Sequence, residues 1–231
     1  NCVKVLIAKE RRTHEKRVAA TPETTKKLSA IGIAVVVESG AGAGANIADD
    51  AYREAGAEIV SDISAVQNVD LLLAVQRPGG DTGANPIECL KEGGLLVGML
   101  APTAEPEHVS EYARQGVIAF SLEYLPRITR AQSMDVLSSQ SNLSGYKAVL
   151  DAASVYGRAM PMMMTAAGTV APARVFVMGA GVAGLQAIAT ARRLGAIVSA
   201  TDVRPVSKEQ VESLGAKFVM VESTEQESAE T

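Results

Sequence analysis

The chain has 231 residues, of which 47% are apolar and 21% charged, enough to form one large domain or two smaller ones. Its formal charge of −4 provides no basic field for a phosphate backbone, and 3% aromatic residues without tryptophan provide little surface for stacking bases. These values argue against nucleic acid as a partner. The two cysteines are too few for a disulfide framework or a zinc cluster, and the sequence predicts no membrane span.

Short apolar runs alternate with helical patterns through the first half of the chain, as in a parallel sheet with crossover helices. The runs that predict strands are 3–8, 33–37, 70–76, 95–99 and 117–122, and the patterns that predict helices are 22–30, 49–54, 86–91 and 106–114. We therefore expect residues 1–138 to form a Rossmann-like or flavodoxin-like α/β domain.

A long helical pattern over 143–159 follows, and we expect residues 139–160 to link two domains. Beyond it, strands are predicted at 175–178, 197–201 and 217–221, with helices at 182–194 and 207–214. A dinucleotide-binding domain normally has about six strands, so residues 161–231, with the acidic segment 222–231, should be its truncated first half. The predicted fold class is α/β, with two Rossmann-like doubly wound parallel-sheet domains joined by a long helix, the second incomplete.

The strongest local signal is the run Gly179-Ala180-Gly181-Val182-Ala183-Gly184, which follows an apolar strand and opens a helix. In this pattern Gly179 permits the tight turn, Gly181 lets backbone amides approach a pyrophosphate, and Gly184 allows close packing of the helix on the sheet. The run predicts a dinucleotide site.

Asp202 ends the next predicted strand, where a carboxylate would accept hydrogen bonds from the adenosine ribose. Its charge would repel a 2′-phosphate, so NAD is favoured over NADP. Arg204 weakens this argument because its guanidinium could pair with that phosphate.

Two further segments have competing interpretations. The run 40–45 also matches the glycine pattern, but the next helical pattern starts late and no acid is well placed, so a structural loop is the better interpretation. The segment 127–135 brings two cations, an amide and a carboxylate to the end of a predicted strand, where ligands bind in α/β folds. A solvated loop explains it equally well.

Several segments together resemble the NAD(H)-binding component, domain I of the α subunit, of the proton-translocating NAD(P) transhydrogenases. They are Lys9-Glu10-Arg11-Arg12 with Arg17-Val18-Ala19, then 38–44, 126–135, 138–143 and 162–169. The segment 126–135 is specific to that family, whereas the first two segments are shared with the related alanine dehydrogenases.

This resemblance implies roles for the residues of both nucleotide segments. The loop would close over the NAD(H) nicotinamide, with Gln132, Arg127 and Asp135 taking part in catalysis. The implied cofactor-binding residues are Arg127, Ile128, Thr129, Arg130, Gln132, Asp135, Ser138, Gly179, Gly181, Val182, Gly184, Asp202, Val203 and Arg204. No metal site is expected.

The sequence departs from the alanine dehydrogenases where their chemistry needs proton transfer. Gln76 stands at the position of their catalytic lysine, and Ala101 lies near that of their histidine, although Arg17 matches their substrate-carboxylate arginine. A glutamine is no general acid or base. Hydride exchange between two nicotinamides requires no proton transfer, so it suits this sequence better.

The resemblance therefore implies a Re/Si-specific NAD(P)+ transhydrogenase component that binds NAD(H), with NADP(H) supplied by a partner domain. The implied partners are the NADP(H)-binding domain, the proton-translocating membrane domain and a second copy of this chain in a homodimer. The implied location is the cytoplasmic face of the bacterial inner membrane, or the matrix side in mitochondria. Two alternatives stay open: an alanine-dehydrogenase-like enzyme and a non-catalytic nucleotide-binding module.

Overall fold

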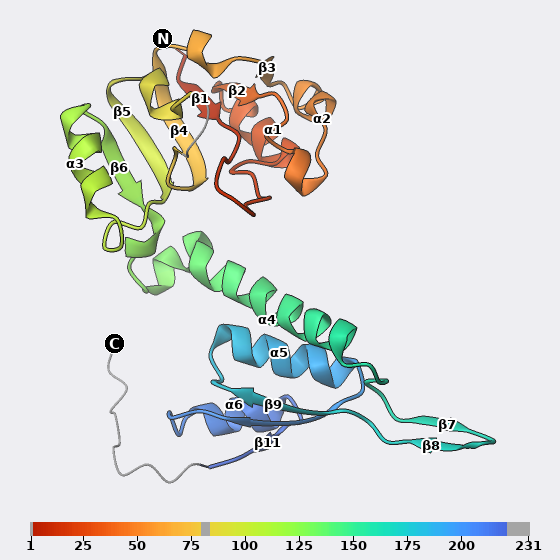
Figure 1. Cartoon of the computed structure of the whole chain (residues 1–231). Coiled ribbons are helices and arrows are strands. Elements are labelled where there is room, and N and C mark those ends of the chain that lie inside the picture. The colour runs from red at the N-terminus through yellow and green to blue at the C-terminus, as the bar shows by residue number, and fades with distance from the viewer. Residues whose placement is uncertain (1, 80–83, 221–231) are drawn as a thin grey trace. The chain divides into compact units, whose positions relative to one another are not determined.

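The computed structural model describes residues 2–79 and 84–220, so the predicted acidic segment 222–231 and Val221 lie outside the described residues. The chain divides into two compact units at Met134 and Asp135. Each unit is an α/β structure built on a parallel sheet, which confirms the predicted fold class (Figure 1). The finer division at 138 and 160 stays a prediction.

The first unit contains a six-stranded sheet in the order β3-β2-β1-β4-β5-β6. Its strands are β1 (Lys4–Ile7), β2 (Ala34–Glu38), β3 (Glu58–Val60), β4 (Val69–Gln76), β5 (Leu90–Met99) and β6 (Ile118–Ser121). Every neighbouring pair is parallel. The order reverses between β1 and β4, and the carboxyl ends of the strands at such a switch point form the usual ligand crevice of this architecture.

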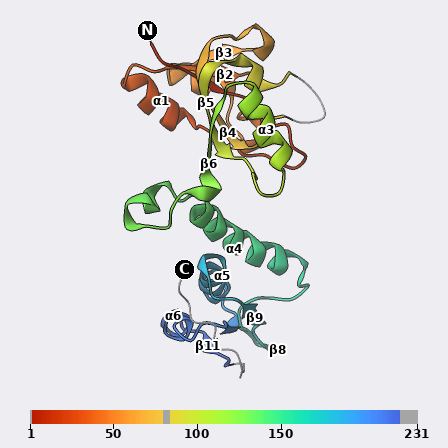
Figure 2. The ribbon, with the colours of Figure 1, turned by 90° about the vertical axis from the view of Figure 1, so that its left-hand side faces the viewer.

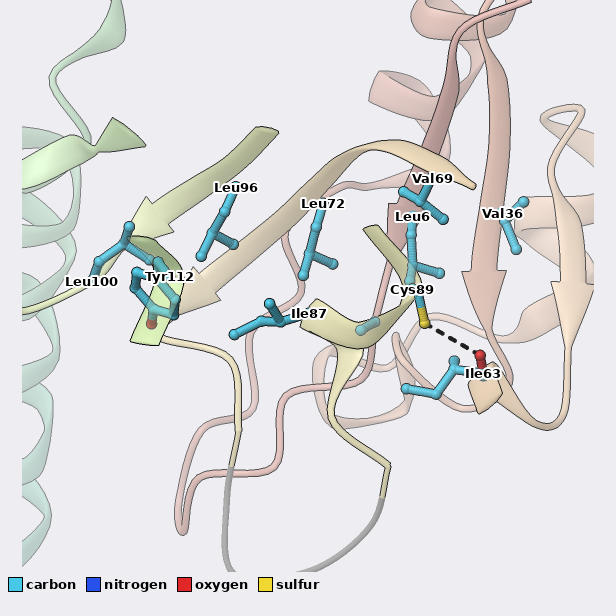
Figure 3. Close-up of a cluster of buried hydrophobic side chains, with 11 residues drawn as sticks. Leu6, Val36, Ile63, Val69, Leu72, Ile87, Cys89, Leu96, Leu100 and Tyr112 are labelled. Atoms are coloured by element: carbon cyan, nitrogen blue, oxygen red, sulfur yellow. Dashed lines mark hydrogen bonds between the residues drawn. The ribbon is translucent and has the colours of Figure 1, made fainter. Parts of the chain in front are cut away.

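Two apolar cores lie on opposite faces of this sheet, because successive strand residues point to opposite sides. Leu6, Leu72 and Leu96 face one core, which Tyr112 of a helix completes (Figure 3). Val5 and Val37 face the other, closed by the buried Tyr52, whose hydroxyl donates to the Ala20 carbonyl. The Cys89 thiol donates to the Ile63 carbonyl within the first core, so this cysteine is a buried structural residue.

The helices of the first unit begin where local chemistry stops the chain from staying extended. They are α1 (Pro22–Ala30), α2 (Asp49–Glu54) and α3 (Pro106–Arg114). Thr21 and Thr24 form a reciprocal cap before α1, and proline occupies the start of both α1 and α3. The helix predicted at 86–91 is only a short 3-10 turn (Pro86–Cys89), because β5 already begins at Leu90.

The second unit contains a parallel sheet in the order β11-β10-β9, which is the arrangement of one mononucleotide-binding half. Its strands are β9 (Arg174–Met178), β10 (Ile197–Thr201) and β11 (Lys217–Phe218), with the helices α4 (Val136–Val155), α5 (Val182–Arg193) and α6 (Ser207–Ser213). In both ribbon views α4 runs beside α5 (Figures 1 and 2). Their shared core includes Val149, Ala180 and Ile188.

Two features of this unit differ from the sequence prediction. The long helix begins at Val136 rather than near 143, because the Asp135 carboxylate accepts from the Ser138 amide and starts the helix within a serine-rich stretch. It ends at Val155, shortly before Gly157 adopts a positive φ of 69°. The methionine-rich segment forms a projecting hairpin of β7 (Met163–Thr165) and β8 (Gly168–Val170), which was not predicted (Figure 1).

Among the helices of the described residues, none combines the length and the apolar character that crossing a membrane requires.

Candidate functional site

The glycine-rich turn joins β9 to α5, as the sequence predicts. Gly179 has a φ of 91°, which favours glycine, and its amide donates to the Thr201 carbonyl at 2.8 Å. A Cβ at Gly184 would lie 1.8 Å from the Gly179 oxygen, closer than any real contact. The first and third glycines of the pattern therefore let the turn and the helix pack together.

The N-terminus of α5 is open at Gly181, the N-cap residue, which has no side chain to cap the helix. A Cβ built at Gly181 would meet no atom within 4 Å in this structure. The first-turn amides of a helix have no partner within it and carry its positive dipole end, so they suit an anion. The space and the donors fit a pyrophosphate.

Asp202 follows β10 beside this turn, and its side chain is 7% exposed. Its carboxylate accepts from the Ala180 amide at 2.6 Å and from the Arg204 amide and guanidinium at 2.8–3.2 Å. The Arg204 guanidinium holds the pKa of Asp202 well below its usual range. Asp202 is therefore an ionised acceptor at the place where a ribose would lie, while the neighbouring Val203 is 80% exposed.

Replacing Asp202 with asparagine is expected to lower the affinity for NADH about tenfold and to raise that for NADPH. The substitution removes the charge that repels a 2′-phosphate and releases Arg204 to bind it. Titration of both nucleotides by fluorescence measures the change. In a D202N/R204Q control the gain for NADPH should vanish, and an unchanged preference in D202N would contradict the assignment.

The second glycine run closes on the protein itself. A Cβ at Gly42 would lie 2.8 Å from the Ile47 oxygen, and one at Gly44 would lie 2.8 Å from the Lys16 oxygen. The Asp49 carboxylate accepts from the Gly40 amide at 2.9 Å, where an anion would otherwise bind. These contacts support the interpretation of 40–45 as a structural loop.

The segment 127–134 belongs to the first unit and forms a 3-10 turn (Thr129–Met134) around the buried Ala131. The side chains of Arg127, Arg130 and Gln132 are exposed, as are those of Ile128 and Thr129. Three polar side chains thus stand on a turn anchored by one small buried residue. Such an arrangement suits a ligand-contacting loop.

Asp135 and Ser138 belong to the second unit and are engaged with each other. The Asp135 carboxylate accepts from the Ser138 amide at 2.9 Å and from its hydroxyl at 2.5 Å. This pair orders the start of α4 directly after the loop. The structure therefore gives Asp135 a capping role, and its part in catalysis stays a prediction.

At the switch point of the first unit, a carboxylate that the sequence analysis did not single out organises the polar residues. Glu15 accepts from the Arg17 amide and guanidinium at 2.7–2.9 Å and from the Gln76 side-chain amide at 2.5 Å. Glu10 accepts from the Val75 amide at 2.7 Å, and burial raises the pKa of this carboxyl group. Pairing of Glu15 and Arg17 leaves the cluster without the extra cation that a lysine at position 76 would provide.

The pKa of Glu15 is lowered to about 2, chiefly by the hydrogen bonds from Arg17. A folded-state pKa below the unfolded one stabilises the protein above the unfolded value, near 4.5, and this contribution is lost as the pH falls toward 2. We expect Glu15→Gln to lower the free energy of unfolding by about 2 kcal/mol at pH 7.

The difference in unfolding free energy between the wild type and Glu15→Gln should narrow steadily below pH 5. Urea unfolding at a series of pH values measures this. Glu54→Gln, which alters an exposed carboxylate at the end of α2, is the matched control. A difference that is independent of pH would contradict the pairing of Glu15 with Arg17.

Ala101 lies just after β5 and has a left-handed φ of 50°. The Glu123 carboxylate holds this bend by accepting from the Leu100 and Ala101 amides at 3.1 and 2.9 Å. His108 lies on α3, with Nδ1 3.4 Å from a Glu111 oxygen. The position predicted to lack a catalytic histidine is thus a backbone bend without a titratable side chain.

Glu105, Glu107 and His108 gather at the start of α3 with potential ligand atoms within 4.8 Å of one another. Glu105 also binds the guanidinium of Arg12 at 3.0 Å and that of Arg77 at 2.6 Å. Two cations already neutralise this carboxylate, so the cluster is better suited to holding loops together than to binding a metal ion.

The parallel sheets and the glycine turn define a Rossmann-type α/β protein. Residues 6–144 match the family described as "Alanine dehydrogenase/PNT, N-terminal domain", and residues 148–231 match "Alanine dehydrogenase/PNT, C-terminal domain". The chain therefore belongs to the alanine dehydrogenase/PNT family, as the sequence resemblance implied.

The chain is similar to proteins from both branches of this family. It is 53% identical to the first of the separately encoded pieces of the NAD(P) transhydrogenase alpha subunit of Rhodospirillum rubrum over 99% of the chain, and 28% identical to alanine dehydrogenase of Bacillus subtilis over 90%. The crystal structure of transhydrogenase from Sinorhizobium meliloti superimposes with a TM-score of 0.89 at 55% identity, over 95% of this chain and 62% of that one. The chain spans 60% of the R. rubrum protein and 54% of the B. subtilis protein.

Proposed function

We propose that this chain is the NAD(H)-binding part of a proton-translocating NAD(P) transhydrogenase. The observation that carries the proposal is the Gly179–Gly184 turn with Asp202, in a chain 53% identical to a transhydrogenase alpha subunit. The open helix end would bind the pyrophosphate, and Asp202 would bind the adenosine ribose.

The bound nicotinamides supply the chemistry, a direct Re/Si-specific transfer of hydride between NAD(H) and NADP(H). The protein contributes position rather than acid and base groups, and orientation alone lowers such barriers strongly. Arg127 would bind the nicotinamide end and the pyrophosphate, and Gln132 would bridge to the second nucleotide. Asp135 and Ser138 would order the loop and orient the carboxamide.

NADP(H) would be brought by a partner domain, and protons would cross in a membrane domain, for which the described helices of this chain are unsuited. The relatives' names, which specify one piece of an alpha subunit, support the existence of further subunits. We further propose a homodimer bound peripherally at the cytoplasmic face of the bacterial inner membrane, or at the matrix face in mitochondria.

Alanine dehydrogenase activity is the alternative that the family membership favours. It would need a general acid or base at the switch point, where the described residues place Gln76 against Glu15. The neutral Gln76 is therefore the observation that favours transhydrogenation. A non-catalytic nucleotide-binding module is the remaining possibility.

Reduction of an NAD analogue by NADPH tests the proposal, using the full-length protein mixed with a purified NADP(H)-binding domain. Rapid transfer only when both proteins are present would support transhydrogenation. NADH oxidation that depends on pyruvate and ammonium would show an alanine dehydrogenase instead. Nucleotide binding without either reaction would show a non-catalytic module.

A further inference from the structure

Gly145 is the point at which α4 comes against the first turn of α5. It is buried, and a Cβ at this position would lie 2.0 Å from the Ala183 carbonyl oxygen, 2.8 Å from its carbon and 3.0 Å from its Cα. All three atoms belong to backbone, so rotation of a side chain could not relieve the overlap. Only glycine permits this approach of the two helices.

The peptide bond that α4 contacts is part of the predicted dinucleotide site. It joins Ala183 to Gly184, whose own missing Cβ permits the contact with the Gly179 oxygen. The first turn of α5 therefore touches α4 through the Ala183 carbonyl and the glycine turn through Gly184. Its amides, which face the pyrophosphate position, are held by backbone contacts of two different elements.

We infer that Gly145 is a positioning residue of the nucleotide site, a fourth glycine outside the glycine-rich run. By admitting α4 against the Ala183–Gly184 peptide, it sets the place of the first-turn amides of α5. The same uninterrupted helix is capped by Asp135, where the loop containing Gln132 ends. This inference rests on the proposed binding of NAD(H) to α5.

The competing explanation is that Gly145 serves packing alone. Val149 lies one helical turn further along α4 and is 6% exposed in the core shared with α5. Val149→Ala therefore loosens the same helix pair without placing an atom against the Ala183–Gly184 peptide. It is the matched control for Gly145→Ala.

The experiment compares both variants with the wild type in the full-length protein, measuring NADH affinity by fluorescence and stability by urea unfolding. We expect Gly145→Ala to weaken NADH binding about tenfold and Val149→Ala to leave it nearly unchanged, although both are less stable. Hydrogen exchange of the wild type supplies a second readout that needs no variant to fold. NADH should slow the exchange of amides in 142–148 as well as in 182–185.

Each outcome decides the matter. Equal NADH affinity in the two variants, or protection confined to 182–185, would overturn the positioning role while leaving the proposed function intact. Failure of the wild type to bind NADH would overturn both. Selective loss of affinity in Gly145→Ala, or NADH-dependent protection of α4 should that variant not fold, would support the inference.

Discussion

Hydride transfer is expected to slow about 100-fold when Gln132 is replaced by asparagine, because misplacement by about 1 Å costs this much in reactions that depend on orientation. The side chain of Gln132 is exposed on a turn fixed by the buried Ala131, so a shorter amide changes its reach and not the fold. In the proposed function it bridges to the second nucleotide. NADH affinity should therefore stay within about twofold of the wild type.

Stopped-flow transfer between NADPH and an NAD analogue, combined with NADH titration, separates the two quantities for Gln132→Asn. Gln115→Asn makes the same chemical change at an exposed position after α3 and should alter neither. A large loss of NADH affinity with normal transfer would show that Gln132 binds the first nucleotide rather than bridging to the second.

Replacement of Gly184 by alanine should abolish NADH binding at ordinary concentrations, with an expected loss on the order of 100-fold. The new Cβ would lie 1.8 Å from the Gly179 oxygen, so α5 must move away from the turn even without nucleotide. Both the free energy of unfolding and NADH affinity should therefore fall, the former by about 2 kcal/mol.

Gly181→Ala is the informative partner of this variant. Its Cβ meets no protein atom within 4 Å and its φ is −75°, so its stability should match that of the wild type. Its affinity for NADH should still fall, because the methyl group would enter the space assigned to the pyrophosphate. Normal NADH binding by Gly181→Ala would place the nucleotide elsewhere.

The glycine-rich turn and Asp202 could be predicted because their chemistry is local. A tight turn, a helix start and an acid after the next strand occur at fixed spacing, and the structure has them in that order. Gly145 could not be predicted as part of this arrangement. It lies 34 residues before Gly179, and only the packing of α4 on α5 brings it to the Ala183 carbonyl.

The same reason separates Gln76 from Glu15. The replacement of a catalytic lysine by Gln76 followed from the family resemblance, but its partner Glu15 lies on the loop after β1. Contact between them arises because β1 and β4 are neighbours at the switch point of the sheet. The long helix was placed too late because the serines of 138–144 have modest helix propensity, which the Asp135 cap and the packing of Gly145 and Val149 outweigh.

By itself the sequence determined the α/β class, the family and the glycine turn, because hydrophobic period and turn chemistry act between residues close in the chain. The tertiary structure decided which charges neutralise each other, where α4 begins and which backbone atoms meet without a Cβ between them. Those contacts join residues far apart in the chain, and strand order and helix packing bring them together.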